Sequence, residues 1–185
     1  MVGMQLPKVY EPGEYETDIY DLWEKSGAFV PEKRGGKDNF AMVFPLPNAN
    51  GNLHLGHGLT NAIYDVVIRY QRMKGNAALY LPGADHAGFE TQVVYEKKLA
   101  AEGKSRFDFT REELYTQVYD FVQQNKHNFE NQFRRLGASC DWSRYVFTLD
   151  EKIITRAYAT FKQLWDDGLV YRGERLVNFC THHGT

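Results

Sequence analysis

Two histidines are the residues of this sequence whose type and spacing best suit chemistry. His54 and His57 stand where a helix is expected to begin, and their spacing puts them on one side of it. The free amides and dipole of a helix N-terminus attract phosphate. Two imidazoles there could hydrogen-bond a polyphosphate whose charge grows in a transition state. Gly56 and Gly58 would let a ligand approach the backbone closely. The spacing alone equally fits a capping histidine beside a packing histidine.

An aspartate and a C-terminal cluster are the other candidates. Asp85 lies in a loop between two glycines, where its carboxylate could hold an ammonium group or could cap the helix that follows. Cys180 and His183 have a spacing that zinc tolerates, but a closed structural site needs four ligands. Exposed histidines beside a buried or free cysteine are the alternative for this cluster.

The elements that must position these residues are a strand, a helix and a second strand. Residues 40–44 form an apolar run without alternation, which predicts a strand buried on both faces, and 77–81 form another. Between them, apolar residues spaced by three and four predict a helix from His54 to Lys74, closed by Gly75 in a left-handed conformation. Such a unit implies a right-handed parallel crossover. Ligands of open sheets collect beyond the carboxyl ends of the strands, so Asn48, the histidines and Asp85 are expected at one crevice.

Other segments follow the usual helix signals. Residues 1–16 are expected to be an irregular arm before a short helix that ends at Ser26-Gly27. A further helix is expected over 90–101. Thr110 and Glu113 predict a capping box that opens a helix running to Leu136. Thr148 and Glu151 predict the same device for a last helix ending at 167–168, followed by a strand over 169–179.

Composition excludes several classes of protein. The chain has 185 residues, 43% of them hydrophobic and 15% aromatic, which is ample for one core. A net charge of −2 gives no global attraction to nucleic acid or to anionic membranes. Two cysteines make no disulfide framework, and no apolar run is long enough to span a bilayer. Without a signal-peptide core at the start, a cytoplasmic protein is expected.

Several motifs together resemble one family. Residues 45–57, Pro-Leu-Pro-Asn-Ala-Asn-Gly-Asn-Leu-His-Leu-Gly-His, resemble the "HIGH" signature region of class I aminoacyl-tRNA synthetases, with Leu55 in the variable second position. Residues 82–92 are similar to the G-x-D-H-A-G-x-x-T-Q of the valine-specific members. Residues 136–144, 147–150 and 169–173 also resemble those members, so the likeness runs over essentially the whole chain.

The resemblance implies a fold and a reaction. The fold would be α/β, the N-terminal half of a Rossmann-like (HUP-type) doubly wound parallel-sheet catalytic domain with additional helices. Residues 1–39 would be an arm and short helix, 40–168 the first half of the catalytic domain, and 169–185 the start of the editing insertion. The reaction would be ATP-dependent activation of L-valine and its transfer to tRNA(Val), by a monomer that binds no membrane. Magnesium would accompany the ATP.

The resemblance also implies roles for individual residues. His54 and His57 would be catalytic and would bind ATP together with Asn52 and Gly56. The amino acid would be bound by Pro45, Leu46, Asn48 and Asp85. If zinc binds at the end of the chain, Cys180 and His183 would be its ligands, with further ligands from outside this sequence.

Two departures from the family pattern matter. Leu46 stands where the family usually has proline. The chain also lacks the editing insertion, the lysine-bearing "KMSKS" loop and the anticodon-binding region, which argues against activity of these 185 residues alone. Two alternatives stay open: a ligase for isoleucine or leucine, and a non-catalytic nucleotide-binding or tRNA-associated module derived from this fold.

Overall fold

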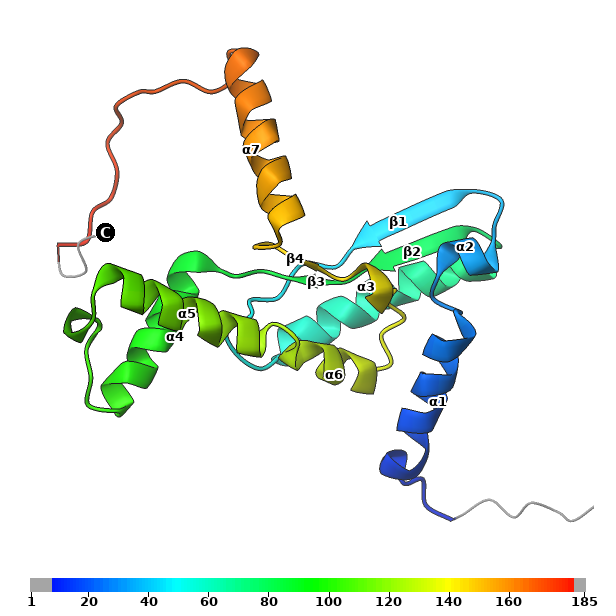
Figure 1. Ribbon diagram of the computed structural model, residues 1–185. Helices are drawn as coiled ribbons and strands as arrows, with labels where there is room; N and C mark the ends of the chain where they lie inside the picture. Colours follow the sequence, from blue (N-terminus) through cyan, green and yellow to red (C-terminus); the bar gives the residue numbers. More distant parts are fainter. Residues whose placement is uncertain (1–7, 182–185) are drawn as a thin grey trace, which may run out of the picture. The chain divides into compact units, whose positions relative to one another are not determined.

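The computed structural model of the protein describes residues 8–181 (Figure 1). Close contacts divide the chain after Leu149, so the part up to Leu149 and the part from Asp150 are described separately. The first part contains α1 (Pro12–Ser26), α2 (Pro31–Arg34), β1 (Asn39–Val43), α3 (Leu55–Met73), β2 (Ala77–Leu81), β3 (Gly83–Ala84), α4 (Gly88–Ala101), α5 (Arg111–Asn125), α6 (Asn128–Arg135) and β4 (Val146–Phe147), with 3-10 turns at Arg106–Asp108 and Trp142–Arg144. The second part contains α7 (Glu151–Asp166).

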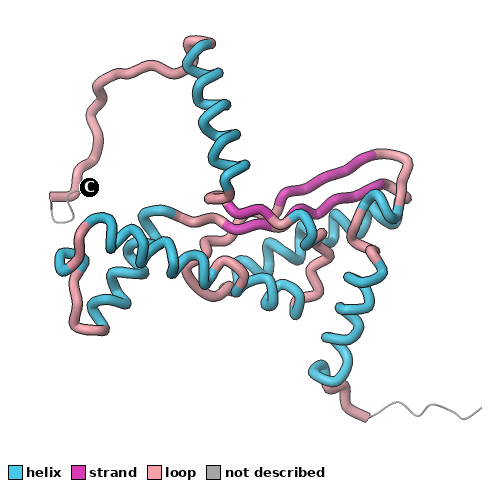
Figure 2. The backbone as a smooth tube through the Cα atoms, in the orientation of Figure 1, coloured by secondary structure: helices cyan, strands magenta, loops and turns pink. Residues whose placement is uncertain are grey.

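A parallel crossover carries the candidate site. β1 pairs with β2 in parallel, in a register from Asn39 opposite Ala77 to Val43 opposite Leu81, and α3 connects the two strands (Figure 1). Figure 2 shows the strands running side by side with α3 along them. Gly75 follows α3 with a φ of 86°, as the sequence predicts. The predicted strand–helix–strand unit is therefore confirmed, and its two strand ends lie at one edge.

Burial of β1 on both faces, in contrast, was a wrong prediction. Alternate residues of this strand are exposed, and Val43 retains 56% of its accessible surface. The reason is that α3 covers one face of the β1–β2 pair, while no second helical layer covers the other face within residues 8–149. An apolar run indicates that a strand is suited to burial on both faces. It does not show whether another element is present to cover each face.

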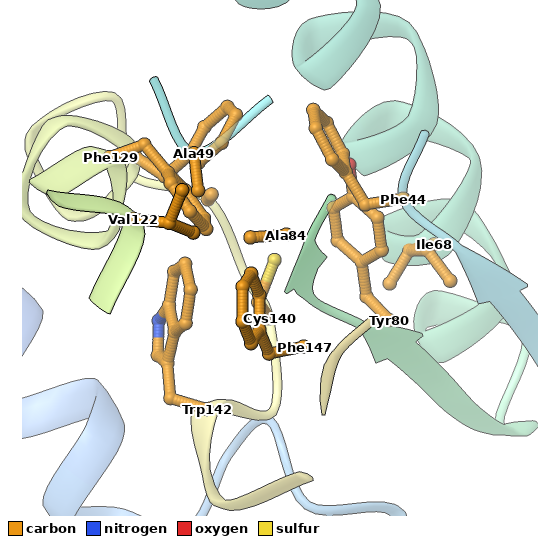
Figure 3. Close-up of a cluster of buried hydrophobic side chains, with 12 residues drawn as sticks. Phe44, Ala49, Ile68, Tyr80, Ala84, Val122, Phe129, Cys140, Trp142 and Phe147 are labelled. Atoms are coloured by element: carbon orange, nitrogen blue, oxygen red, sulfur yellow. The ribbon is translucent and has the colours of Figure 1, made fainter. Parts of the chain in front are cut away.

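The core lies where the ends of β1 and β2 meet α5, α6 and the segment before β4 (Figure 3). Half of its members are aromatic, and burial of one such side chain contributes about 1.5–3 kcal/mol. The cluster consists of Phe44, Ala49, Ile68, Tyr80, Ala84, Val122, Phe129, Phe133, Ala138, Cys140, Trp142 and Phe147. α1 is tied to this core because the Tyr20 hydroxyl donates to the Ala138 carbonyl at 2.6 Å and accepts from the Trp142 indole N–H at 2.7 Å.

A buried polar network anchors α3 to residues 137–139. The Arg72 guanidinium donates to the Ser139 hydroxyl at 2.5 Å and to the Ser139 carbonyl at 2.9 Å. The Asp65 carboxylate accepts from the Ser139 amide at 3.1 Å and from Arg69 Nε at 2.7 Å. Loss of one partner from such a network leaves a buried charge uncompensated, which costs about 3–5 kcal/mol. The network thus holds α3, and with it the histidine end of the helix, in one orientation.

Two helix predictions need correction. The predicted irregular arm over 1–16 is wrong in its last residues, because α1 already begins at Pro12, whose ring suits the first helical position. The single helix predicted from Thr110 to Leu136 is two helices, α5 and α6, with a turn at Lys126 and His127. At the turn the Lys126 carbonyl accepts from the Tyr145 hydroxyl at 2.8 Å. Apolar spacing continues through this break, so periodicity does not reveal it.

The predictions for the end of the chain also differ from the structure. Asp150, and not Thr148, is the N-cap residue of α7, so the predicted capping box of Thr148 and Glu151 is wrong. The strand predicted over 169–179 is wrong as well, because these residues form neither helix nor strand (Figure 2). A strand requires hydrogen bonds to a neighbouring strand, and this segment has none within residues 150–181. Among the described helices, none combines the length and the apolarity needed to cross a membrane.

Candidate active site

The histidine pair forms a reciprocal cap at the start of α3. His54 is the N-cap residue, and its Nδ1 accepts from the Gly56 amide at 3.1 Å. His57 Nδ1 accepts in turn from the His54 amide at 3.2 Å. The two rings stack with centroids 3.9 Å apart and planes inclined by 26°. The capping role considered from the sequence is therefore real, and it engages one nitrogen of each ring.

This cap decides which hydrogen-bonding group each ring presents. A neutral imidazole whose Nδ1 accepts a hydrogen bond carries its proton on Nε2. Both rings consequently offer an Nε2–H donor at the positive end of a helix dipole. Burial lowers the pKa of His57 below its ordinary value, and the positive charge that His54 acquires on protonation lowers the pKa further. Two neutral donors at the positive end of a helix are suited to the oxygens of a phosphate group.

Gly56 is required by the histidine geometry. A Cβ added at this position would lie 2.9 Å from Cε1 and 3.0 Å from Nδ1 of His54. Any larger residue would therefore displace the His54 ring from the Gly56 amide. The glycine allows the ring to fold back over the first turn of the helix.

The loop before the histidines is held from α6. Gln132 donates to the Asn52 side-chain oxygen at 3.0 Å and accepts from the Leu53 amide at 2.8 Å. Asn128 also donates to the Asn52 oxygen, at 2.9 Å. The oxygen of Asn52 is therefore engaged in fixing the loop, while its amide nitrogen makes no hydrogen bond with the described residues. Sequence reasoning missed Gln132, because a glutamine on an amphipathic helix gives no signal.

The loops after β1 and β2 are joined at Asp85. The Ala49 amide donates to the Asp85 carbonyl at 2.7 Å, and the Asp85 amide donates to the Pro47 carbonyl at 2.9 Å. Asn48 and Asp85 thus face each other in an isolated parallel bridge. The two residues were predicted to lie near one another because parallel strands end at the same edge. The structure brings them together through their backbones.

The Asp85 carboxylate is oriented by three neighbours. Its Oδ1 accepts from the Ala87 amide and from the Thr148 hydroxyl, each at 3.1 Å, and lies 3.4 Å from His86 Nδ1. Ala87, with a φ of 56°, is the N-cap residue of α4, so the alternative interpretation of Asp85 as that N-cap is wrong. Thr148 was assigned to a capping box by its spacing from Glu151, and no signal in the sequence connects it with Asp85.

The remaining predicted residues lie around this bridge. Pro45 is exposed, and Leu46 is partly buried. Leu46 packs closely against Gly83, because a Cβ added to this glycine would lie 2.7 Å from Leu46 Cδ2. Within residues 8–181, no hydrogen bond or ion pair joins the histidine pair to Asp85. Cys180 is exposed, and His183 lies outside the described residues. No group of three or more His, Cys, Asp or Glu side chains that could hold a metal ion lies within the described part of the chain.

The sequence model of the tRNA synthetases class I (I, L, M and V) matches residues 18–185. The chain belongs to this family. Within it, the chain is 45% identical to the valine–tRNA ligase of Psychrobacter arcticus over 95% of its own length, and 44% identical to those of Treponema denticola over 99% and Syntrophotalea carbinolica over 95%. These stretches make up 18%, 20% and 20% of the three relatives, so the chain spans about a fifth of their length.

A solved structure shows the same fold. Agrobacterium radiobacter K84 agnB2 LeuRS, in a ternary complex with tRNA and LeuAMS, matches 95% of this chain with a TM-score of 0.76 and 19% identity. The match covers 21% of that protein. The parallel crossover described above is therefore the start of a class I synthetase catalytic fold, as predicted from the sequence.

Proposed function

We propose that this chain forms one wall of the site at which a class I synthetase joins L-valine to ATP. A carboxylate oxygen of valine would attack the α-phosphorus while the bond from that phosphorus to the pyrophosphate oxygen breaks. Valyl-adenylate and pyrophosphate would result, and the whole protein would then transfer the valyl group to tRNA(Val). The identities of 44–45% to valine–tRNA ligases support valine over isoleucine or leucine.

The pairing of His54 with His57 carries this proposal. Negative charge grows on the phosphate oxygens as the new bond forms, and donors that already point at that charge lower the barrier. Two Nε2–H groups at the N-terminus of a 19-residue helix are such donors, because their Nδ1 atoms are occupied by backbone amides. Neither imidazole needs to gain or lose a proton during this step.

The other predicted residues would bind the two substrates. Asn52 and Gly56, with the histidines, would hold the nucleotide, and Gly56 would lie under the adenine. Asp85 would hold the valine ammonium group, while Asn48 and the backbone at Pro45 and Leu46 would shape the aminoacyl pocket. The family resemblance implies magnesium with ATP. We assign no residue of this chain to that metal, because the described residues contain no ligand cluster for it.

Calorimetry with a non-hydrolysable valyl-adenylate analogue tests this proposal. We expect the chain to bind the valyl analogue more tightly than the isoleucyl and leucyl analogues. His54→Ala combined with His57→Ala should weaken binding at least about ten-fold, since a hydrogen bond to a charged group contributes about 1.5–3 kcal/mol. His127→Ala is the matched control, because His127 is also an N-cap residue but belongs to α6 and makes no side-chain cap.

Three results of this experiment would count against the proposal. Tighter binding of the isoleucyl analogue would show that isoleucine, and not valine, is the preferred amino acid. No binding at millimolar concentration would favour the non-catalytic module. Equal losses in His127→Ala and in the double variant would show that the histidine pair has no special part. ATP–pyrophosphate exchange with valine then tests whether these residues alone carry out the first reaction.

A further inference from the structure

The short β3–β4 pair puts Thr148 beside Asp85. Gly83 pairs with Val146 and Ala84 with Phe147, in parallel, and the Thr148 amide donates to the Ala84 carbonyl at 3.1 Å. Continued by one residue, this register sets Thr148 opposite Asp85. Side chains of directly opposite residues in a sheet lie on the same face. The ladder therefore fixes this neighbour of Asp85 from a distant part of the sequence.

The Thr148 hydroxyl is shared by three polar groups. Its Oγ1 lies 3.1 Å from Asp85 Oδ1, 2.9 Å from the His86 amide nitrogen and 2.6 Å from His86 Nδ1. A hydroxyl has one proton to donate and two lone pairs to accept with. The carboxylate only accepts and the amide only donates, so the hydroxyl proton goes to Asp85. His86 Nδ1 must then donate to Thr148, which leaves the lone pair of this imidazole on Nε2.

The two oxygens of Asp85 are consequently different. Oδ1 accepts from Thr148 and from the Ala87 amide, whereas Oδ2 makes no hydrogen bond with the described residues. The side chain is 42% exposed, so Oδ2 can reach a ligand. An ammonium group donates three hydrogen bonds and accepts none, which matches this open oxygen.

We propose that Thr148 is a positioning residue of the amino-acid half of the site. It turns the Asp85 carboxylate so that one oxygen is held by the protein and the other faces the ammonium group of the ligand. It also holds His86 in the tautomer that carries its proton on Nδ1. The part that concerns the ammonium group rests on the proposed function, and the part that concerns His86 does not.

Binding of two adenylate analogues to variants of the whole chain tests the first part. One analogue carries a valyl group, and the other carries 3-methylbutanoyl, which lacks the ammonium group. Thr148→Val removes the hydroxyl at constant shape and should weaken the valyl analogue about ten-fold, with less than about a two-fold change for the other. Thr148→Ser keeps the hydroxyl and should bind both analogues within about three-fold of the original chain. Thr116→Val is the matched control, because the Thr116 hydroxyl donates only to a carbonyl within α5.

Nitrogen-15 NMR of the imidazoles tests the second part without any ligand. The original chain and Thr148→Ser should show His86 protonated on Nδ1, and Thr148→Val should show loss of this preference. The measurement on the original chain needs no variant, so it decides the tautomer even if Thr148→Val fails to fold. Protonation on Nε2 in the original chain would overturn the proposal.

The two tests separate failure of the inference from failure of the proposed function. Equal weakening of both analogues by Thr148→Val, or no weakening of either, would overturn the positioning role while the valine site stands. If the original chain binds neither analogue at millimolar concentration, the proposed function fails for this chain. The NMR result then supports or overturns the remaining role of Thr148 in holding His86.

Discussion

The two halves of the candidate site are ordered by different means. At the histidine pair, the capping bonds join residues two or three positions apart. At Asp85, the bonds come from residues 47–49 on one side and from Thr148, 63 positions away, on the other. The histidine half is thus largely a property of one helix start. The Asp85 half exists only when three distant segments pack together.

This difference predicts which half is more sensitive to loss of tertiary structure. A local cap survives partial unfolding elsewhere if its helix survives. A site made by a two-residue ladder does not, because short ladders have no stability of their own. Substitutions should therefore affect the two halves separately.

Gly83→Ala should have the largest effect, and on the Asp85 half. The new Cβ would lie 2.6 Å from the Val146 carbonyl oxygen, so β3 and β4 would have to move apart. We expect a loss of about 2 kcal/mol in the free energy of unfolding, measured by urea denaturation. The NMR signals of His54 and His57 should remain unchanged, and Gly13→Ala is a control outside both halves, since nothing lies within 4 Å of its added Cβ. Unchanged stability would show that the ladder tolerates separation.

Gly56→Ala should affect the histidine half with little cost to the fold. Alanine gains up to about 1 kcal/mol of helix propensity over glycine, which offsets a cap loss of similar size. The free energy of unfolding should change by less than about 0.5 kcal/mol. Because the new Cβ displaces the His54 ring, affinity for the adenylate analogue should fall about ten-fold. Gly58→Ala is the matched control, since nothing lies within 4 Å of its added Cβ. Equal affinities of the two variants would contradict the role of the ring.

Gln132→Met should have a smaller effect and would show how far the histidine half depends on the rest of the molecule. This variant removes the partner of the Leu53 amide and one donor to Asn52. We expect a loss of about 1 kcal/mol in stability, the usual net contribution of a hydrogen bond. Asn128→Ala loses only an exposed bond to Asn52 and should change stability by less than about 0.5 kcal/mol. Equal losses would mean that the Leu53 amide is not the important partner.

The protonation of His57 should give the smallest effect. Its folded-state pKa is lowered by burial and by His54, so the unfolded chain binds the proton first as pH falls. The stability contributed by the neutral ring is therefore complete above the ordinary pKa of about 6.5 and is lost between that value and the lowered pKa. His54→Ala should raise the pKa of His57 toward, but not to, its ordinary value, because burial remains. An NMR titration measures the pKa of His57 in this variant. An unaltered pKa would show that His54 does not contribute to lowering it.

Some features of the fold were predictable because their causes are local. The bounds of β2, the left-handed Gly75 and the capping box of Thr110 with Glu113 follow from short patterns, and all three are confirmed. The turn between α5 and α6 was not predictable, because the apolar spacing continues through Lys126, whose carbonyl accepts from the distant Tyr145 hydroxyl. The contact of Thr148 with Asp85 was not predictable either. The spacing of Thr148 from Glu151 fits a capping box, and no pattern in the sequence indicates that Thr148 lies beside Asp85.

The sequence by itself determined the family, the parallel crossover and the histidine pair at the start of α3. Motifs, apolar periodicity and a cap that closes within one helical turn all act over short stretches of chain. Only the tertiary structure decided which oxygen of Asp85 stays open. It also decided that Thr148 and Gln132 hold the site. Hydrogen bonds between segments far apart in the chain depend on how the sheet register and the helices bring them together, and no local pattern contains that information.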